Sequence, residues 1–267
     1  MPLILKAPSA VAFSVFGFDI RYYGIMLFFG MIFGLFVSLK IAKKYYKNVN
    51  PDILLDFFPW LIIVSLIFAR IYYVLLSFEF YSKHPSEIFA LWHGGISIHG
   101  AILGGIIAGF VYFKIIKKIP LLPYADVVSY GLAIGQAIGR WGNFFNQEAF
   151  GTPSDLPLKL YIDPAFRPYR FMDYEYFHPA FLYESLWDIF IFLILCFLLK
   201  KYPKKPSGAV FFAYLGLYST GRIFIENIRT DSVLDVHNLP IALIVSILCL
   251  LIAIFALIFI TCKNKTA

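Results

Sequence analysis

The sequence predicts an all-α membrane protein that crosses the bilayer about seven times. Hydrophobic residues make up 60% of the 267-residue chain and charged residues only 15%, and the mean hydropathy is +0.77. A soluble core could not hide this much apolar surface, and one membrane span needs about 20 mostly apolar residues. Seven such runs use roughly half of the chain. We therefore expect one integral membrane domain over residues 1–267 and no separate soluble domain.

The expected spans are joined by short polar connections. They cover residues 22–42, 53–78, 98–114, 124–140, 180–199, 207–226 and 239–262. Before the second span, Asn50-Pro51-Asp52 is a helix-start signal, because proline suits the first helical turn. Residues 1–20 lack the pattern of a cleavable signal and are expected to form a short interfacial segment. Residues 142–179 are expected to form an extracytoplasmic cap, either irregular or small α/β.

The lysines give the expected orientation. Thirteen of the 16 follow the first, third, fifth and seventh spans, and the positive-inside rule places those connections in the cytoplasm. The N-terminus is then outside and the C-terminus cytoplasmic. The seven arginines lie instead in outer connections or toward outer helix ends. Because arginine suits bidentate recognition of phosphate or carboxylate, this split predicts an outward-facing site for an anion. It also argues against a nucleic-acid partner, despite the net charge of +7.

Glycines recur four residues apart in several expected spans, as in Gly30 with Gly34, Gly100 with Gly104, and Gly131 with Gly135. Small residues at this spacing allow helices to approach closely in a membrane. We therefore interpret these glycines as helix-packing positions. The three cysteines lie in or at the end of apolar runs, at a spacing that fits neither a metal site nor a disulfide framework. No metal and no cofactor are expected.

The most concentrated polar cluster is GRWGNFFNQEAFG, at residues 139–151. It follows the fourth span and contains Arg140, Asn143, Asn146 and Glu148. An arginine at a membrane edge is costly unless it is paired or faces water or ligand. The alternative is an interfacial anchor, with the arginine reaching the headgroups beside an aromatic belt. That alternative does not account for two asparagines and a glutamate, so we interpret the cluster as a candidate site.

Three further clusters lie at expected outer helix ends. Glu184 and Asp188 share one face of the fifth span, and intramembrane carboxylates usually pair with a cation. The sixth span ends in an alternating charged stripe of Arg222, Glu226 and Arg229, which on a soluble helix would be an ordinary solvated face. A histidine near neutral pH can act as a general base, which makes His99 at the start of the third span a candidate.

Two residues outside these clusters also have a predicted role. Tyr23 stands at the outer start of the first span, where it is either an aromatic-belt residue or part of the site. Gln136 lies one turn before Arg140, and its expected role is a hydrogen bond between helices.

The chain resembles the prolipoprotein diacylglyceryl transferase family. The resemblance rests on the pattern Gly-Arg-x-Gly-Asn-Phe-x-Asn-x-Glu-x-x-Gly, which residues 139–151 meet at every fixed position. It extends to RYYG in the first span, GGISIHG before the third, HPAFLYE in the fifth and GRIFIENIRTD in the sixth. Ile98 and Phe181 depart from the residues that are common in the family. The resemblance covers nearly the full length of the chain.

The resemblance implies transfer of a diacylglyceryl group from phosphatidylglycerol to the lipobox cysteine of a prolipoprotein signal peptide, with release of glycerol phosphate. It implies a bacterial cytoplasmic (inner) membrane enzyme whose active site faces the outer leaflet. Together with the polar clusters it gives the catalytic candidates His99, Arg140, Arg222 and Glu226. The substrate-binding candidates are Tyr23, Asn143, Asn146, Glu148, Gly151, Glu184 and Arg229.

As a hypothesis, Arg140 and Arg222 clamp the phosphate, because a bidentate guanidinium stabilises developing phosphate charge. Glu148 and Glu226 orient these arginines or contact the donor glycerol, and His99 takes the thiol proton. Two other classes stay open at this point. A membrane transporter would gather its polar residues near the midplane, and a non-catalytic scaffold of the lipoprotein pathway would bind anionic lipid without transfer.

Overall fold

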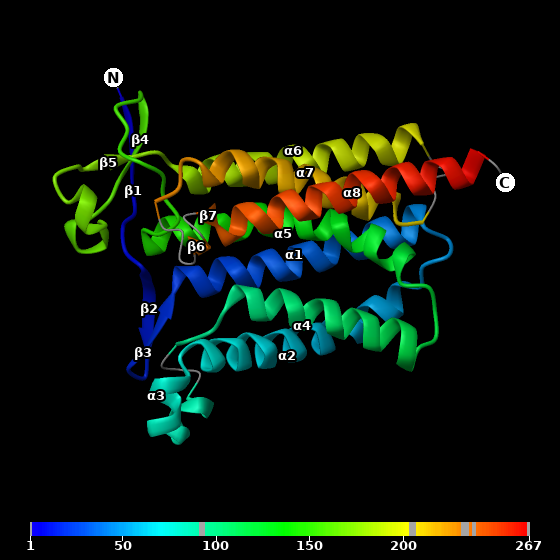
Figure 1. The fold of residues 1–267 in the computed structure, drawn as a ribbon, viewed down its shortest axis with the longest axis horizontal. Coiled ribbons are helices and arrows are strands. Elements are labelled where there is room, and N and C mark those ends of the chain that lie inside the picture. Colours follow the sequence, from blue (N-terminus) through cyan, green and yellow to red (C-terminus); the bar gives the residue numbers. More distant parts are fainter. Residues whose placement is uncertain (1, 91–93, 203–206, 231–234, 237–238, 266–267) are drawn as a thin grey trace. The chain divides into compact units, whose positions relative to one another are not determined.

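The computed structural model describes residues 2–90, 94–202, 207–230, 235–236 and 239–265. The chain divides into two compact units, Met1–Ile41 with Ala125–Ala267, and Ala42–Tyr124. Long helices prevail in each unit (Figure 1). Among the described residues, five helical segments are long and apolar enough to cross a membrane. These are α1 (Tyr22–Tyr45), α2 (Pro51–Leu76), α4 (Ile98–Phe110) with the π-helical η3 (Val111–Ile116), α6 (Ala180–Lys201) and α8 (Ile241–Lys265).

The two remaining long helices, α5 (Leu122–Asn146) and α7 (Ala209–Glu226), are not among those five. Both carry polar residues of the candidate site, including Arg140 on α5 and Arg222 with Glu226 on α7. Helices were expected at both places and are found there, whereas the count of seven spans stays a prediction. Helix α5 continues past Arg140, the expected end of the fourth span, through Asn146. Asn143 and Asn146 are therefore helical.

In the larger unit, α1 and α5 meet at glycines. A Cβ added to Gly30 would lie 2.7 Å from the carbonyl oxygen of Gly135, and Gly34 lies equally close to Gly131. Only glycine permits this backbone approach, which confirms the packing role predicted for these residues. Helix α7 packs against both α6 and α8 (Figure 1).

The start of α7 is capped from another helix. The buried Asp126 on α5 accepts hydrogen bonds from the backbone N–H groups of Gly208, at 2.7 Å, and Phe211, at 2.8 Å. These groups lie at a helix N-terminus, where backbone donors lack partners within the helix and a carboxylate is favourable. These bonds therefore fix the position of α7 along α5, and with it the position of Arg222 relative to Arg140.

Short strands form within the N-terminal region, for which a short interfacial segment was expected and stays a prediction. Strand β1 (Leu3–Lys6) pairs parallel with β4 (Leu158–Tyr161), and β4 pairs antiparallel with β5 (Tyr176–Phe177). Strands β2 (Val11–Val15) and β3 (Phe18–Arg21) form an antiparallel pair that leads directly into α1. These strands were not predicted because the pairing of residues 3–6 with residues 158–161 is long-range, and hydrophobic periodicity does not report such contacts.

The cap between α5 and α6 contains β4, β5 and two 3₁₀ turns, η4 (Pro164–Phe166) and η5 (Tyr169–Phe171). Buried aromatic and aliphatic side chains attach it to the ends of those helices; they are Phe144, Phe150, Leu160, Ile162, Phe177 and Phe181. A third short pair joins β6 (Asp235–Val236) to β7 (Leu239–Pro240) just before α8.

In the smaller unit, α2 packs along α4 (Figure 1). The side chain of Asn50 accepts a hydrogen bond from the backbone N–H of Asp52 at 2.9 Å, and Pro51 is the first helical residue, which confirms the predicted helix start. Gly100 and Gly104 lie against the α2 backbone, as their spacing predicted. Helix α3 (Phe78–Lys83) and the 3₁₀ helix η1 (Pro85–Phe89) follow α2.

Candidate functional site

Three guanidinium groups converge on one buried carboxylate in the larger unit. Glu184, near the start of α6, forms ion pairs with Arg140 of α5, with Arg222 of α7, and with Arg229 just beyond α7. The Nη1–Oε1 distances are 2.8 Å for Arg222 and 3.2 Å for Arg229. The Glu184 side chain is only 4% exposed. Because an unpaired charge is very unfavourable at such burial, the three arginines and Glu184 depend on one another.

A second carboxylate completes this cluster. Glu226 lies one turn after Arg222 on α7, and its side chain is 2% exposed. Its Oε2 forms an ion pair with the Nη2 of Arg222 at 2.5 Å. The two carboxylates thus hold the two ends of one guanidinium fork. The arrangement agrees with the prediction that Glu226 orients an arginine. We call Arg140, Glu184, Arg222, Glu226 and Arg229 the arginine cluster.

Close helix packing at Gly221 brings the cluster together. A Cβ at this position would overlap the indole ring of Trp187 on α6. The Nε1 of Trp187 donates a hydrogen bond to the carbonyl oxygen of Leu217 at 3.0 Å, which holds the ring against α7. Since Glu184 and Arg222 flank this contact, a glycine at 221 sets the distance between them.

Two tyrosines of α7 extend the polar contacts toward α5. The hydroxyl of Tyr214 donates to the Oε1 of Gln136 at 2.6 Å, which confirms the helix–helix hydrogen bond predicted for Gln136. The Nη2 of Arg140 donates to the hydroxyl of Tyr218 at 3.3 Å. Sequence reasoning missed both tyrosines, although positions 214, 218, 222 and 226 follow one another at the four-residue spacing of one helix face.

The amides of the 139–151 cluster contact a different carboxylate. Glu148 accepts a hydrogen bond from the side-chain amide of Asn143 at 2.9 Å and another from that of Asn146 at 3.4 Å. Its described contacts are therefore with amides, and the hypothesis that Glu148 orients an arginine is not supported. Tyr23 packs against Gly142, where an added Cβ would lie 2.9 Å from its ring. The structure thus brings Tyr23 to the same helix end.

Gly151 acts through its backbone. It forms an antiparallel bridge with Arg229, and its N–H donates to the carbonyl oxygen of His178 at 2.9 Å. A Cβ there would lie 2.7 Å from the Cβ of His178 and 3.0 Å from the carbonyl oxygen of Ile228. The position therefore requires glycine, and its bridge positions the arginine that reaches Glu184.

The other four arginines are not members of the arginine cluster. The buried Arg70 donates to the carbonyl oxygens of Glu87, Ile88, Gly94 and Gly95, at 2.5–2.9 Å. Arg167 donates to the carbonyl oxygens of Ile162 and Met172, and Arg170 to that of Thr230. Arg21 is exposed at the end of β3.

His99 belongs to the smaller unit. It is exposed in the first turn of α4, and its ring lies 6.1 Å from that of Tyr72 on α2, centroid to centroid. The backbone N–H of Ser97 donates to the carbonyl oxygen of Ala69 at 3.1 Å, which fixes the start of α4 on α2. The general-base role of His99 stays a prediction.

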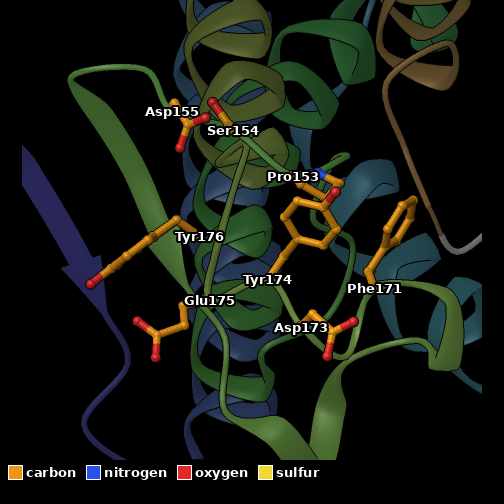
Figure 2. Close-up of a pocket in the computed structure, with 8 residues that line it drawn as sticks. All are labelled: Pro153, Ser154, Asp155, Phe171, Asp173, Tyr174, Glu175 and Tyr176. Carbon is orange, nitrogen blue, oxygen red and sulfur yellow. The ribbon is translucent and has the colours of Figure 1, made fainter.

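The cap has a hollow of about 450 Å³ on its own surface. Figure 2 shows the side chains that line it, which come from residues 153–155, 171 and 173–176. The carboxylates of Asp155, Asp173 and Glu175 are spread around its rim and do not converge on one point. Among the described residues, no three His, Cys, Asp or Glu side chains are grouped to hold a metal ion.

Apolar helices long enough to cross a bilayer, together with a cluster of paired arginines and glutamates, define a helical membrane protein with a charged site between its helices. The family model described as prolipoprotein diacylglyceryl transferase matches residues 10–259. The chain belongs to this family.

Curated relatives agree with this assignment. A phosphatidylglycerol–prolipoprotein diacylglyceryl transferase of Acaryochloris marina is 44% identical over 92% of this chain and 88% of its own length. The protein of the same name from Nostoc sp. is 44% identical over 92% of the chain and 87% of its own length. The one from Synechocystis sp. is 41% identical over 97% and 92%, respectively.

Proposed function

We propose that this protein transfers the diacylglyceryl group of phosphatidylglycerol to the lipobox cysteine thiol of a prolipoprotein. The observation that carries the proposal is the convergence of Arg140, Arg222 and Arg229 on the single buried Glu184. It occurs in a chain whose relatives are named for this reaction. A transporter or a scaffold is not favoured, because those names describe a transferase.

The reaction separates charge at the phosphate. The cysteine sulfur attacks the glyceryl carbon that bears the phosphate ester, and a carbon–sulfur bond forms. The carbon–oxygen bond breaks, and its electron pair leaves with glycerol phosphate. The phosphate goes from a diester with one negative charge toward a monoester with nearly two. Groups that bind the phosphate more tightly as this charge grows accelerate the reaction.

The arginine cluster suits this task. Each guanidinium carries five N–H donors, and the ion pair and hydrogen bond described for Arg140 use two of its three nitrogens. Three positive charges face two glutamates, so the cluster has an excess of positive charge for an anion. The glutamates keep the guanidiniums in place before the lipid arrives, which lowers the reorganisation needed during the reaction.

Residues at the end of α5 suit the glycerol part of the headgroup. The Oδ1 of Asn146 is buried and has no hydrogen-bond partner among the described residues. A buried amide oxygen without a partner is unfavourable, and a hydroxyl group of the headgroup would satisfy it. Asn143, Glu148 and Tyr23 lie at the same helix end and would complete this contact.

The proposed orientation places this site at the outer leaflet of the bacterial inner membrane. The seven spans follow from the apolar runs, and the external N-terminus and cytoplasmic C-terminus follow from the lysine distribution. Phosphatidylglycerol would reach the site from the bilayer, and the signal peptide of a prolipoprotein would present its cysteine there. Single cysteines at Asp155 in the cap and at Lys47 after α1, in a chain lacking its native cysteines, would test this orientation. An impermeant thiol reagent added outside should label only the cap position.

Purified protein in detergent, phosphatidylglycerol and a lipobox peptide provide the decisive assay. Mass spectrometry should detect the peptide with an added diacylglyceryl group, together with glycerol phosphate. Arg140→Lys keeps the charge but loses the fork, so transfer should fall by at least ten-fold if the phosphate gains about 1.4 kcal/mol from it. Arg167→Lys in the cap is the matched control. Folded wild-type protein that gives no mass shift would overturn the proposal.

His99 is proposed to accept the proton of the thiol. A thiol near several arginines can also ionise without a base, and His99→Gln separates these cases. If His99 is the base, the His99→Gln variant should transfer lipid much more slowly than the wild type at every pH from 6 to 8. Raising the pH further should restore part of its rate, because the peptide thiol then ionises without a base. Transfer near the wild-type rate across that range would exclude the role.

A further inference from the structure

A third carboxylate lies beneath the arginine cluster. Asp188 is one helical turn after Glu184 on α6 and is only 2% exposed. Its Oδ2 has no hydrogen-bond partner among the described residues. It lies within electrostatic range of Arg140 but forms no direct ion pair with it in the described contacts. Leaving a buried carboxylate oxygen unpaired is costly, so the position of Asp188 calls for an explanation.

The space around Asp188 decides how it could act. A cavity of about 10 Å³ lies between it and the cluster, lined by Arg140, Glu184, Trp187, Asp188, Tyr218, Gly221, Arg222 and Ile225. This volume has room for about one water molecule. This space is too small for a lipid phosphate, so Asp188 would act on the phosphate through Arg140 rather than by direct contact.

The charge count gives Asp188 a role. Three arginines and two glutamates leave one excess positive charge on the cluster, and an ionised Asp188 neutralises it. The titratable groups around Asp188 are Glu184 on its own helix, Arg140 from α5, and Tyr214, Tyr218 and Arg222 from α7. With the excess charge unopposed, the cluster would hold the nearly dianionic product more firmly than the singly charged lipid.

We propose that Asp188 is a positioning residue that acts as a second counter-ion of Arg140. It lowers the affinity of the arginine cluster for phosphate and so allows the product to leave. The inference rests on the proposed function for its product, glycerol phosphate. The negative charge of Asp188, in the ionised form that the neighbouring Arg140 favours, opposes the binding of any phosphate monoester.

The test compares Asp188→Asn with the wild type by calorimetric titration of glycerol phosphate and by the transfer assay. Removing one unit charge close to the anion should tighten glycerol phosphate binding on the order of ten-fold. In turnover, kcat and the KM for phosphatidylglycerol should both fall, because release of product becomes slower. Asp188→Glu should recover most of the wild-type affinity. Glu175→Gln removes the same charge from the exposed cap and should change neither quantity.

An unchanged affinity for glycerol phosphate in folded Asp188→Asn protein would overturn the proposal. So would a lower unfolding temperature with unchanged affinity, which would make Asp188 a structural residue only. The titration does not require turnover. If wild-type protein binds glycerol phosphate, and the Asn variant binds it more tightly, but neither transfers lipid, then the proposed function fails while the role of Asp188 stands.

Discussion

Glu184 on α6 and Arg222 on α7 lie with Oε1 and Nη1 2.8 Å apart, next to the point where Gly221 admits the ring of Trp187 between the two helices. The ion pair and the helix packing are therefore parts of one arrangement. Arg140 and Arg229 reach the same carboxylate from other elements. Changes to any of these positions should affect both stability and transfer.

Glu184→Gln should be the most damaging conservative change in the cluster. It leaves three buried guanidiniums without their shared counter-ion, and breaking a buried ion pair in this way costs about 3–5 kcal/mol. We expect a large drop in the unfolding temperature in detergent and loss of transfer. Glu79→Gln is the control, because Glu79 pairs with Lys83 on an exposed surface, with side-chain exposures of 91% and 67%. Its effect should stay within about 0.5 kcal/mol, and equal effects would contradict the importance assigned to Glu184.

Gly221→Ala should separate α6 from α7. The added methyl group overlaps the Trp187 ring, which is held by its hydrogen bond to Leu217. Overpacking of this kind typically costs about 1–3 kcal/mol, and transfer should fall because the contact between Glu184 and Arg222 lengthens. Thermal unfolding and the peptide assay measure the two effects. Gly24→Ala on α1 has open space around the new methyl, so it should be neutral or slightly stabilising.

Gly151→Ala should displace Arg229 without touching the substrate. The new Cβ would meet the Cβ of His178 and the carbonyl oxygen of Ile228, which breaks the bridge between residues 151 and 229. We expect a transfer rate reduced by at least ten-fold at modest cost in stability. Gly139→Ala is the matched control, since its Cβ would lie 3.6 Å from the Cδ2 of Leu27, an ordinary contact. Full activity of the Gly151 variant would show that the bridge is dispensable.

Gln147 should hold the cap to the end of α5. Its Nε2 donates to the Oδ2 of Asp163 at 2.5 Å, and its Oε1 accepts from the backbone N–H of Asp163 at 2.7 Å. Gln147→Asn tolerates the positive φ of 53° found here but is too short to reach both groups. The loss of about 1–3 kcal/mol should appear as faster proteolysis within residues 152–175. The Asp155→Asn variant, changed at an exposed residue that lines the hollow, should be cleaved by the protease at the wild-type rate.

Arg70→Lys should loosen the segment that precedes α4. A lysine cannot donate to the four carbonyl groups that the guanidinium reaches together, so proteolysis between residues 84 and 97 should accelerate. The KM for phosphatidylglycerol should stay at the wild-type value when the surviving folded fraction is measured. An increase in the KM for phosphatidylglycerol comparable to that of Arg222→Lys would show that Arg70 contributes to the anion site.

The order of helices could be predicted because apolar length and helix-start residues are local properties of the sequence. The start of α2 at Asn50-Pro51 and the glycine contacts between α1 and α5 follow from such signals. The strand β1 could not be predicted in the same way, since its partner lies more than 150 residues away. Asp126 was overlooked for the same reason, because its partners come from a distant segment.

Taken alone, the sequence determines that this is a helical membrane protein with polar clusters at several helix ends, and its 139–151 pattern determines the family. It also places Glu184, Arg222 and Glu226 on helix faces where they can meet. The tertiary structure decides which charges pair. It gives three arginines to Glu184, turns Arg70 and Arg167 toward backbone carbonyls, and leaves Asp188 beneath the cluster. The reason is physical: helix spacing fixes the face of a side chain, whereas its partner depends on how closely the neighbouring helices pack.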